Sequence, residues 1–535
     1  MTSLLPNRTE LIQTFAVTAE QMRQIEGRMF AAGFPVAALM EKVAGRITDR
    51  ILKYLSDCQT DCQTNSPKIG VLVGPGHNGG DALVVARELY LRGYAVRIHC
   101  PFSKLKELTQ AHLNYVTNLG IPTVQTVDEL QNCEVLIDGL FGFGLEREIT
   151  RDLASDIEQI NRWKLAIFSI DLPSGVQTET GQGLGTAIRA THTLCLGLWK
   201  LAFLQDSALE YIGEAELIDF DIPLPDITAV LGESPKICRI IPQQALKGLP
   251  LPRKPDSHKY KNGHVLIIAG SNQYAGAAIL AGLGARASGV GMLSIAVPQA
   301  IKPLLKAQLP EALVIGCKTT ETGAIQTLPP EIDLNQYDAI ACGPGLTQAV
   351  PGLVQQVLTS HCPVVLDADG LNILAQLDPI KTLSQRSAPS VITPHPGEFK
   401  RLFPDLGEQL SDRITATRSA AVASGSVVLL KGARVCVGNS DRVWINPEST
   451  PALARGGSGD VLTGLLGGLI AGGVLHNVSI EQMTQTAVWW HAQTGIFAAQ
   501  RETELGVDAF TLTKYLTQTL NLTPNLNQKQ KSPRV

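Results

Sequence analysis

The sequence predicts two α/β domains in succession, each built on an open, largely parallel β-sheet covered by helices. Three observations lead to this prediction. Short apolar runs recur along the 535 residues, and most end in a glycine-rich or acidic turn that leads into a helical pattern. Hydrophobic residues make up 44% of the chain and charged residues 18%, which is enough apolar material for two large cores. A proline-rich stretch near the middle separates one series of strands and helices from the next.

The composition also limits the kinds of partner. A formal net charge of −4, with aromatic residues at 5%, argues against binding to nucleic acid or to a membrane surface. The ten cysteines are scattered, only Cys58 and Cys62 lie close together, and no zinc or disulfide framework is visible. The N-terminus lacks the apolar core of a signal peptide, and the apolar stretch 461–474 is too short to span a bilayer. We therefore expect a soluble, cytoplasmic protein.

The first elements follow ordinary helix signals. Thr18 is placed to cap a helix, with Gln21 three residues on as the second half of a capping box. A second helix is expected over residues 37–55, where apolar residues recur at helical spacing. The polar stretch 56–67 is expected to be a loop, and the apolar run 68–73 a buried strand.

A glycine-rich loop, residues 74–81, follows this strand and precedes a helix expected over residues 82–92. Its glycines have the G-x-G-x-x-G spacing of a dinucleotide-binding loop. Such a site also needs an acidic residue at the end of the second strand, and the strand expected over residues 94–98 ends without one. The lysine of a P-loop is absent as well. We therefore predict a phosphate or polar ligand here, but neither an ordinary NAD site nor a P-loop.

Two further apolar runs end in aspartate, at Asp138 and Asp171, and each is followed by a turn that contains glycine. In an open parallel sheet the carboxyl ends of the strands line one crevice, so Asp81, Asp138, Asp171 and Ser174 could converge there. Taken singly, each aspartate is better explained as a loop cap. Three in register at one sheet edge favour a site.

The segment from Thr18 to Pro223 resembles the NAD(P)H-hydrate epimerases. The resemblance rests on Asn-Gly-Gly-Asp at 78–81, on residues 138–147 and on Asp-Leu-Pro-Ser-Gly at 171–175. It implies a Rossmann-like three-layer domain, which we place at residues 1–225.

The epimerase resemblance also implies roles for single residues. A potassium ion would be held by Asn78, Asp138 and Ser174. Asp171 would be the candidate acid or base. Two positions, His77 and Ala82, depart from the family pattern, which commonly has asparagine and glycine there. The implied substrate contacts are His77, Asn78, Gly79, Gly80, Asp81, Gly142, Phe143, Gly144, Leu145, Glu146, Arg147, Glu148 and Asp171.

A second series of elements follows the proline-rich segment. We place a linker at residues 226–240 and a second domain at residues 241–518, which begins with a strand, a Gly-Ser turn and a helix of small residues. The tail, residues 519–535, lacks apolar periodicity and is expected to be disordered. Further strands are expected to end in polar or glycine-rich turns at residues 343–345, 367–372, 393–398 and 431–434.

The densest group of glycines lies in residues 452–464, just before a long apolar run. Backbone N–H groups of such a loop can turn toward one point, and the start of the helix adds partial positive charge, which predicts an anion cradle. Asp460 could cap this helix, or it could accept a proton from a hydroxyl that is being phosphorylated. Lys431 could contact a nucleotide phosphate or could be a solvated surface residue.

Three other polar residues stand at strand ends in this half. His395 lies between two prolines after a buried strand, and it could donate to a ligand hydroxyl or carboxamide. Asp367 and Asp369 could cap a turn, or they could hold Mg²⁺ through water.

The segment from Ile240 to Leu516 resembles the ADP/ATP-dependent NAD(P)H-hydrate dehydratases, which have a ribokinase-like three-layer α/β fold. Thr347, Arg455 and the pair Arg434-Val435 depart from the family pattern. The motifs that carry the resemblance are residues 270–277, 343–345, 393–398, 430–432 and 456–460. The implied substrate contacts are Ala277, Gly345, His395 and Asp460, with Asp460 as the catalytic base. The implied nucleotide contacts are Lys431, Gly432, Ala433, Arg434, Val435 and Gly459.

Together the two resemblances imply repair of NADH and NADPH that have added water at the nicotinamide ring (NADHX and NADPHX). The first domain would interconvert the R and S epimers with K⁺, and the second would dehydrate the S epimer with Mg²⁺ and ADP or ATP. ADP, converted to AMP and phosphate, is the expected donor, and a homo-oligomer is expected. Two alternatives stay open, a ribokinase-type kinase that makes a stable phosphate ester and a first domain that only binds ligand.

Overall fold

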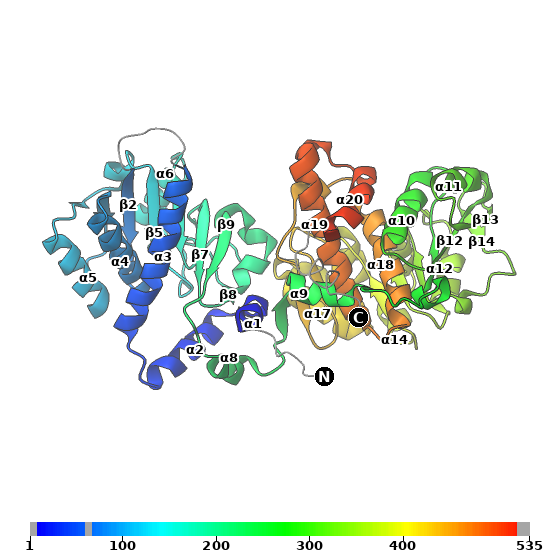
Figure 1. The fold of residues 1–535 in the computed structure, drawn as a ribbon, viewed down its shortest axis with the longest axis horizontal. Helices are drawn as coiled ribbons and strands as arrows, with labels where there is room; N and C mark the ends of the chain where they lie inside the picture. Colours follow the sequence, from blue (N-terminus) through cyan, green and yellow to red (C-terminus); the bar gives the residue numbers. More distant parts are fainter. Residues whose placement is uncertain (1–7, 59–66, 522–535) are drawn as a thin grey trace. The chain divides into compact units, whose positions relative to one another are not determined.

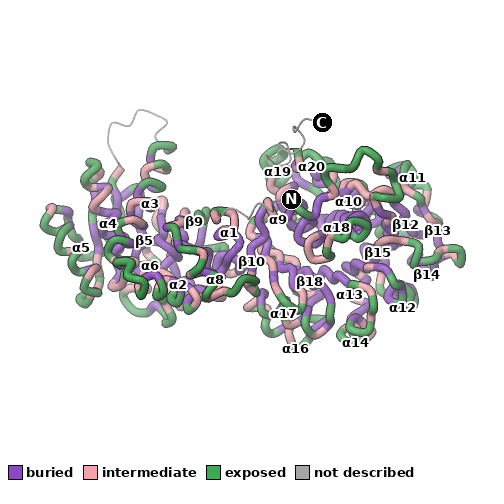
Figure 2. Tube along the Cα trace, turned by 60° about the horizontal axis from the view of Figure 1, so that its bottom comes forward, coloured by how far each residue is buried: buried purple, intermediate pink, exposed green. Residues whose placement is uncertain are grey.

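The computed structural model describes residues 8–58 and 67–521, and its chain divides into two compact units (Figure 1). Residues 1–235 form the first unit and residues 236–535 the second. Both are mixed α/β units built on a central sheet, as the sequence predicts. In each unit buried residues gather on the central strands, and exposed ones on outer helices such as α5, α11 and α14 (Figure 2).

The first unit contains a seven-stranded sheet in the order β4-β3-β2-β5-β6-β7-β9, with every pair parallel. The order reverses between β2 and β5, so the crevice typical of ligand sites in such sheets lies there. The unit also contains a separate two-stranded parallel sheet, formed by β1 (Ala16–Val17) and β8 (Trp199–Lys200). The strands are β2 (Lys68–Val73), β3 (Ala95–His99), β4 (Thr123–Val124), β5 (Val135–Gly139), β6 (Ala166–Ile170), β7 (His192–Leu196) and β9 (Glu214–Ile218).

Two helix predictions for this unit are confirmed. Thr18 caps α2 through a capping box, in which its hydroxyl accepts from Gln21 N at 3.1 Å and the Gln21 amide oxygen accepts from Thr18 N at 3.0 Å. The helix expected over residues 37–55 is α3. The helices are α1 (Arg8–Thr14), α2 (Ala19–Ala31), α3 (Val36–Cys58), α4 (His77–Leu91), α5 (Glu107–Asn118), α6 (Arg151–Ile160), α7 (Leu209–Ile212) and α8 (Leu224–Leu231).

The start expected for α4 at residue 82 is wrong, because the helix begins at His77 and the motif at 78–81 forms its first turn. Its glycines serve close packing rather than a loop. A Cβ on Gly79 would lie 2.0 Å from Gly74 O, and one on Gly80 would lie 2.5 Å from Met40 Cε. The absence of side chains therefore lets the helix start directly on the end of β2.

The second unit contains an eleven-stranded sheet in the order β10-β20-β19-β18-β17-β16-β15-β11-β12-β13-β14. Neighbouring strands from β18 through to β13 are parallel, and the order reverses between β15 and β11. The strands are β10 (Ile237–Arg239), β11 (His264–Ile268), β12 (Met292–Pro298), β13 (Leu313–Thr319), β14 (Ile325–Thr327), β15 (Ala339–Cys342), β16 (Val364–Leu366), β17 (Ser390–Ile392), β18 (Val427–Leu430), β19 (Cys436–Gly438) and β20 (Val443–Ile445).

Helix α18 is the most deeply buried helix of this unit, and small residues let α10 pack directly against it. A Cβ on Gly464 would lie 1.8 Å from Ala281 O, and one on Gly284 would lie 2.2 Å from Val461 O. The helices are α9 (Pro242–Ala245), α10 (Ala275–Ala287), α11 (Lys302–Gln308), α12 (Pro351–Leu358), α13 (Asp369–Leu374), α14 (Pro379–Ser384), α15 (Pro396–Leu402), α16 (Pro404–Gly407), α17 (Arg413–Ser424), α18 (Ser458–Val474), α19 (Ile480–Gly506) and α20 (Ala509–Asn521).

The range expected as a linker, residues 226–240, contains secondary structure at both ends. It includes the end of α8 and the strand β10, which pairs in parallel with β20 and so belongs to the second sheet. Residues 519–521 of the expected tail belong to α20, and residues 522–535 lie outside the described residues. In the described parts of the chain, every helix is too short or too polar to cross a bilayer.

Candidate active sites

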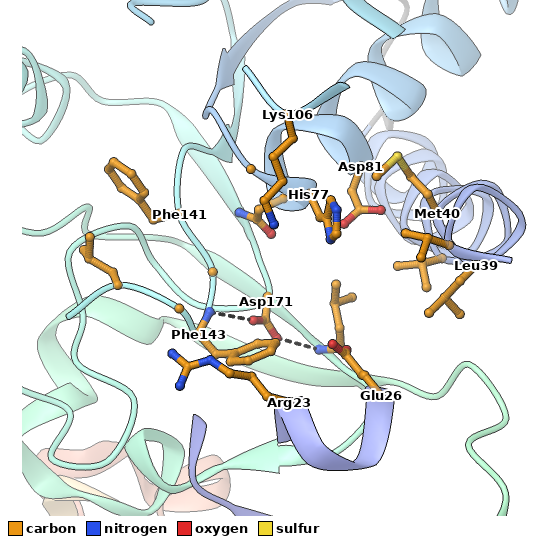
Figure 3. Close-up of a pocket in the computed structure, with 18 of the residues that line it drawn as sticks. Arg23, Glu26, Leu39, Met40, His77, Asp81, Lys106, Phe141, Phe143 and Asp171 are labelled. Carbon is orange, nitrogen blue, oxygen red and sulfur yellow. Dashed lines mark hydrogen bonds between the residues drawn. The ribbon is translucent and has the colours of Figure 1, made fainter. Parts of the chain in front are cut away.

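The first unit has a cavity of about 540 Å³ at the carboxyl ends of β2, β5 and β6. It therefore opens at the reversal of strand order between β2 and β5. Helices α2, α3 and α4 supply the other walls (Figure 3). The charged or titratable side chains that line it are Arg23, Glu26, His77, Asp81, Lys106 and Asp171.

Asp171 stands at the end of β6 and is held by three donors. Its Oδ2 accepts from Phe143 N at 2.9 Å, and its Oδ1 accepts from Leu196 N at 3.2 Å (Figure 3). The third donor is the ammonium group of Lys200, a fully buried side chain that also donates to Leu196 O at 2.5 Å. Burial lowers the pKa of Lys200, but the Asp171 carboxylate outweighs this effect and leaves that pKa above its usual value. The two side chains therefore form a buried ion pair.

Two further carboxyl groups face the cavity, and neither forms a hydrogen bond to another described residue. Glu26 comes from α2 and is half-buried, while Asp81 comes from α4 and is only 8% exposed. Burial raises the pKa of Glu26 to about 7, with Lys200 opposing the rise and Asp171 adding to it. Burial, then Asp171 and Glu26, raise the pKa of Asp81 well above its usual value. Glu26 can therefore carry a proton near neutral pH, and the surroundings of Asp81 favour its protonated form.

Asp138 and Ser174 lie together below this cavity, as their predicted convergence requires. The Asp138 carboxylate is fully buried and accepts from Ser174 Oγ at 2.5 Å, Ser174 N at 2.9 Å, Ser169 Oγ at 2.7 Å and Leu140 N at 3.2 Å. Burial raises the pKa of Asp138, and these neutral donors oppose the rise. Among the described residues no lysine or arginine forms an ion pair with it. The buried charge is therefore hydrogen-bonded but not neutralised.

The other residues predicted from the epimerase resemblance fall into two groups. Arg147 and Glu148 are exposed and lie outside the cavity lining, and the exposed Glu146 forms an ion pair with Arg23 at 2.7 Å. The predicted substrate contacts that do line the cavity are His77, Asn78, Asp81, Gly142, Phe143, Gly144, Leu145 and Asp171. The buried pair Gly79 and Gly80 pack beneath the lining instead.

In the second unit the glycine-rich segment leads into α18, which begins at Ser458, so Asp460 lies in the first turn. The alternative that Asp460 caps the helix is wrong, because Gly457 is the capping residue and no side chain bonds to the free N–H groups. Burial raises the pKa of Asp460 to about 7, helped by Asp367 and Asp369 and opposed by Lys431. A partly buried carboxyl group with a pKa near neutrality is suited to act as a general base.

Lys431 is not a solvated surface residue, because it is paired with the buried Asp367. Its Nζ donates to Asp367 Oδ1 at 2.5 Å, and Thr463 Oγ1 donates to Asp367 Oδ2 at 2.5 Å. The Lys431 ammonium also lies 3.3 Å from the position of a Cβ on Gly459. The Lys431 ammonium is thus fixed beside Gly459, the residue before Asp460, at the start of α18. This ammonium and the helix N-terminus both favour an anion there.

His395 caps α15 with its side chain. Nδ1 accepts from Gly397 N at 3.0 Å and from Glu398 N at 3.3 Å, so in the neutral imidazole the proton lies on Nε2. Burial, Lys431 and Arg401 lower the pKa of His395, which keeps the ring neutral at pH 7. The side chain is 52% exposed. Nε2 can therefore donate a hydrogen bond to a ligand, as the sequence suggested.

The remaining residues predicted from the dehydratase resemblance lie at the same end of the sheet. Gly345 has a φ of 66°, and a Cβ there would lie 2.9 Å from the Cβ of Ala277 on α10. Gly432 follows β18 and packs on the guanidinium group of Arg413. The predicted nucleotide contacts between β18 and β19 are Lys431, Gly432, Ala433, Arg434 and Val435. Their roles as ligand contacts stay predictions.

Sequence reasoning missed four residues of these sites. Glu26 and Lys200 carried no motif, since one is an ordinary position in an amphipathic helix and the other is the second residue of a two-residue strand. Thr463 was seen only as part of an apolar run. His491, buried on α19, places its Nε2 3.0 Å from Ser458 O, and burial lowers its pKa to about 4. The sequence alone cannot identify a buried lysine or histidine as part of a site, because its hydrogen-bond or ion-pair partner comes from a distant part of the chain.

Comparison with known proteins agrees with both resemblances. A family model described as NAD(P)H-hydrate dehydratase matches residues 265–518, and one described as YjeF-related protein N-terminus matches residues 36–202. A crystal structure of the ADP/ATP-dependent NAD(P)H-hydrate dehydratase from Bacillus subtilis, co-crystallised with ATP and Mg²⁺, is 33% identical, with a TM-score of 0.44. It covers 50% of this chain and 93% of that one.

Relatives also match along almost the whole chain. The bifunctional NAD(P)H-hydrate repair enzyme Nnr of Synechocystis sp. is 51% identical over 501 residues, which cover 94% of this chain and 94% of the relative. The protein of the same name from Thermosynechococcus vestitus is 48% identical over 506 residues, which cover 94% and 97%. Because the similarity spans both units, the chain belongs to the family of bifunctional NAD(P)H-hydrate repair enzymes.

Proposed function

We propose that the second unit converts the S epimer of NADHX or NADPHX back to NADH or NADPH, with Asp460 as the catalytic base. The observation that carries this proposal is the position of Asp460, with its pKa raised to about 7, in the first turn of α18 beside the Lys431–Asp367 ion pair. A hydroxyl that loses its proton here lies next to the charges that would hold a phosphoryl group.

The reaction would proceed in two stages. Asp460 accepts the proton of the C6 hydroxyl while that oxygen attacks the terminal phosphorus of the nucleotide, which breaks the bond from that phosphorus to the bridging oxygen and releases AMP when ADP is the donor. The C6–O bond of the phosphate ester then breaks, inorganic phosphate leaves, and loss of a C5 proton restores the ring double bond. Lys431 and the N–H groups of Gly459 and its neighbours would stabilise charge on the transferred group. His395 Nε2 would donate to the substrate.

The donor would be ADP, which yields AMP and phosphate, with ATP as the alternative. Mg²⁺ would arrive on the nucleotide phosphates, since Mg²⁺ keeps several waters and takes only one or two carboxylates. Asp367 and Asp369 are the nearest candidates for such contacts, and the ion would neutralise phosphate charge.

We propose that the first unit interconverts the R and S epimers in the 540 Å³ cavity, so that the second unit can use both. Residues 77–81 and 142–148 would contact the substrate, with Asp171 at the centre. The N-terminus of α4 would face a phosphate group of the dinucleotide, as its position at the end of β2 allows.

A potassium ion fits the group Asn78, Asp138 and Ser174. Asp138 is a buried carboxylate with neutral partners, and the side-chain nitrogen of Asn78 is buried and has no hydrogen-bond partner among the described residues. Rotating that amide by 180° would present its oxygen, the atom that a hard cation prefers. The cation would supply the missing positive charge beside Asp138.

Replacement of K⁺ by choline is expected to slow epimer exchange by about tenfold or more, because an unneutralised Asp138 would favour its protonated form and disturb the loop at 140–143. Dehydration of the pure S epimer is the internal control and should keep its rate. Equal loss of both activities, or no loss of either, would contradict the potassium assignment.

The overall function is tested by the absorbance at 340 nm when the protein meets mixed NADHX epimers with Mg²⁺ and either ADP or ATP. Complete recovery of NADH is expected, and the faster nucleotide identifies the donor. Recovery that stops after one epimer would leave the first unit as a binding module. A stable phosphorylated product without NADH would instead favour the ribokinase-type kinase.

The dehydration rate is expected to rise with pH through about 7, because Asp460 accepts a proton only when it is ionised and its pKa is raised to about 7. The rate should be low at pH below this value and level off above it. Measuring kcat with saturating S epimer and nucleotide checks this, and a rate that falls from pH 6 to pH 8 would remove Asp460 as the base. We place this activity in the cytoplasm and expect a homo-oligomer.

A further inference from the structure

The proposed epimerase reaction needs two groups that exchange protons from opposite sides of one carbon. Inversion at C6 removes a hydroxyl from one face of the ring and adds one to the other face. A proton donor must therefore stand on one side and a proton acceptor on the other. Asp171 fits neither role well, because Phe143 N, Leu196 N and the buried Lys200 ammonium already occupy its carboxylate.

Two other carboxyl groups in the cavity meet this need. Asp81 is more than nine-tenths buried, lines the cavity and forms no hydrogen bond to a described residue. Glu26 lines the same cavity from a different helix and likewise forms no hydrogen bond to a residue that the structure describes. Figure 3 shows Asp81 on the side of α4 and Glu26 on the side of α2, with Asp171 between them.

We propose that Glu26 and Asp81 are the two groups that act as acid and base in epimer exchange, Glu26 from the α2 wall of the cavity and Asp81 from the α4 wall, and that Asp171 positions the substrate. This inference rests on the proposed function of the first unit. It assigns catalysis to a residue outside every motif of the sequence, Glu26, and to the motif residue Asp81, which the resemblance implied only as a substrate contact.

The step balances without any further reactant. One carboxyl group gives its proton to the C6 hydroxyl, the C6–O bond breaks and water leaves with the bonding electron pair. The lone pair of the ring nitrogen forms a C6=N1 double bond, which makes the ring cationic. A second water then adds its oxygen to the other face, the π electrons return to nitrogen, and the other carboxylate takes the released proton. The pair ends in the reverse protonation state, ready for the opposite direction.

The residues around the cavity favour both the cationic ring and the two proton transfers. The Asp171 carboxylate and the ring of Phe143 lie at the cavity wall, where they can stabilise a cationic ring. The Glu26 carboxylate adds to the rise in the pKa of Asp81, which favours a state in which Asp81 is protonated while Glu26 is ionised. The ionisable groups that face the pair are Arg23 on α2, His77 on α4, Lys106, Asp171 and Lys200.

The first test compares Glu26→Gln and Asp81→Asn with the full-length parent. Pure S epimer is incubated without nucleotide, so that the second unit stays silent, and the R epimer is measured by chromatography against a blank without protein. Each variant is expected to slow enzymatic exchange by about 100-fold or more. Glu20→Gln, an exposed position on the same helix as Glu26, is the matched control and should keep the parent rate.

The outcomes separate this inference from the function on which it rests. A parent that shows no exchange above the blank defeats the proposed epimerase function itself. A parent that exchanges, together with either variant within about threefold of it, overturns the inference alone. Dehydration of the S epimer with ADP, measured on the same preparations, shows that each variant chain is made and active in its second unit.

A second measurement needs no variant and decides the matter if a variant fails to fold. The parent exchanges epimers in water enriched in ¹⁸O, and the mass of the new R epimer is determined. Each inversion by the proposed step installs one oxygen from solvent, so the R epimer should carry the label as it first appears. An R epimer that retains the original oxygen would overturn the inference.

Discussion

The variant Asp460→Asn is expected to lower kcat for dehydration by about 10²–10⁴-fold, because an amide cannot accept the proton of the C6 hydroxyl. Asparagine has nearly the same shape and leaves α18 in place, and the helix start does not use the Asp460 side chain as a cap. KM for the nucleotide should change little. The rate is measured as NADH formed from pure S epimer at saturating nucleotide.

Two comparisons make this result specific to the base. Asp441→Asn changes an exposed carboxylate of the same unit, paired with Lys236, and should leave the rate unchanged. Epimer exchange by the first unit should also be unaffected in Asp460→Asn. A variant that keeps more than about a tenth of the parent rate would show that another group accepts the proton.

The variant Lys200→Met is expected to destabilise the first unit by about 3–5 kcal/mol, since it leaves the Asp171 carboxylate buried without its counter-charge. The side chains of Lys200 and Asp171 are 0% and 4% exposed, so solvent screens this pair little. Calorimetry of the full chain should show the transition of the first unit shifted to lower temperature and that of the second unit unchanged.

A second substitution, at Asp171, checks the expected loss of stability in Lys200→Met. Adding Asp171→Asn to Lys200→Met removes the stranded charge and should recover most of the lost stability. Arg50→Met breaks the half-exposed pair of Arg50 with Glu216 and should cost no more than about 1 kcal/mol. A loss of that small size for Lys200→Met would mean that the buried pair contributes little.

The fold could be predicted well from the sequence because the buried strands of parallel sheets are short, nearly continuous apolar runs that are easy to recognise. The runs that end at Val73, Asp138 and Asp171 are continuous in apolar residues, and they became β2, β5 and β6. Periodicity and turn chemistry act locally, so they can be read without knowing the rest of the chain. The start of α4 could not be read in this way, because it depends on how closely Gly79 approaches Gly74 across the end of β2.

The sites were predictable only where a motif marked them. Asp138 and Ser174 stand at or just after the ends of apolar runs, Asp460 stands in a glycine-rich segment before one, and the structure brings the first two into contact at 2.5 Å. Glu26 and Lys200 reach the first cavity from distant parts of the chain. Their roles depend on burial and on the charges around them, which appear only when the chain is folded.

The close contact between α10 and α18 sets a limit on natural variation far from any ligand. Gly464 lies one turn beyond Asp460, and its bare Cα touches the backbone of α10 at Ala281, where even a methyl group has no room. A chain that replaced this glycine could repack only by sliding α18, and the Asp460 carboxylate would move with it. Such a substitution is therefore expected to slow dehydration as well as to destabilise the unit, because misplacing a reacting group by about 1 Å can cost about 10²-fold in rate.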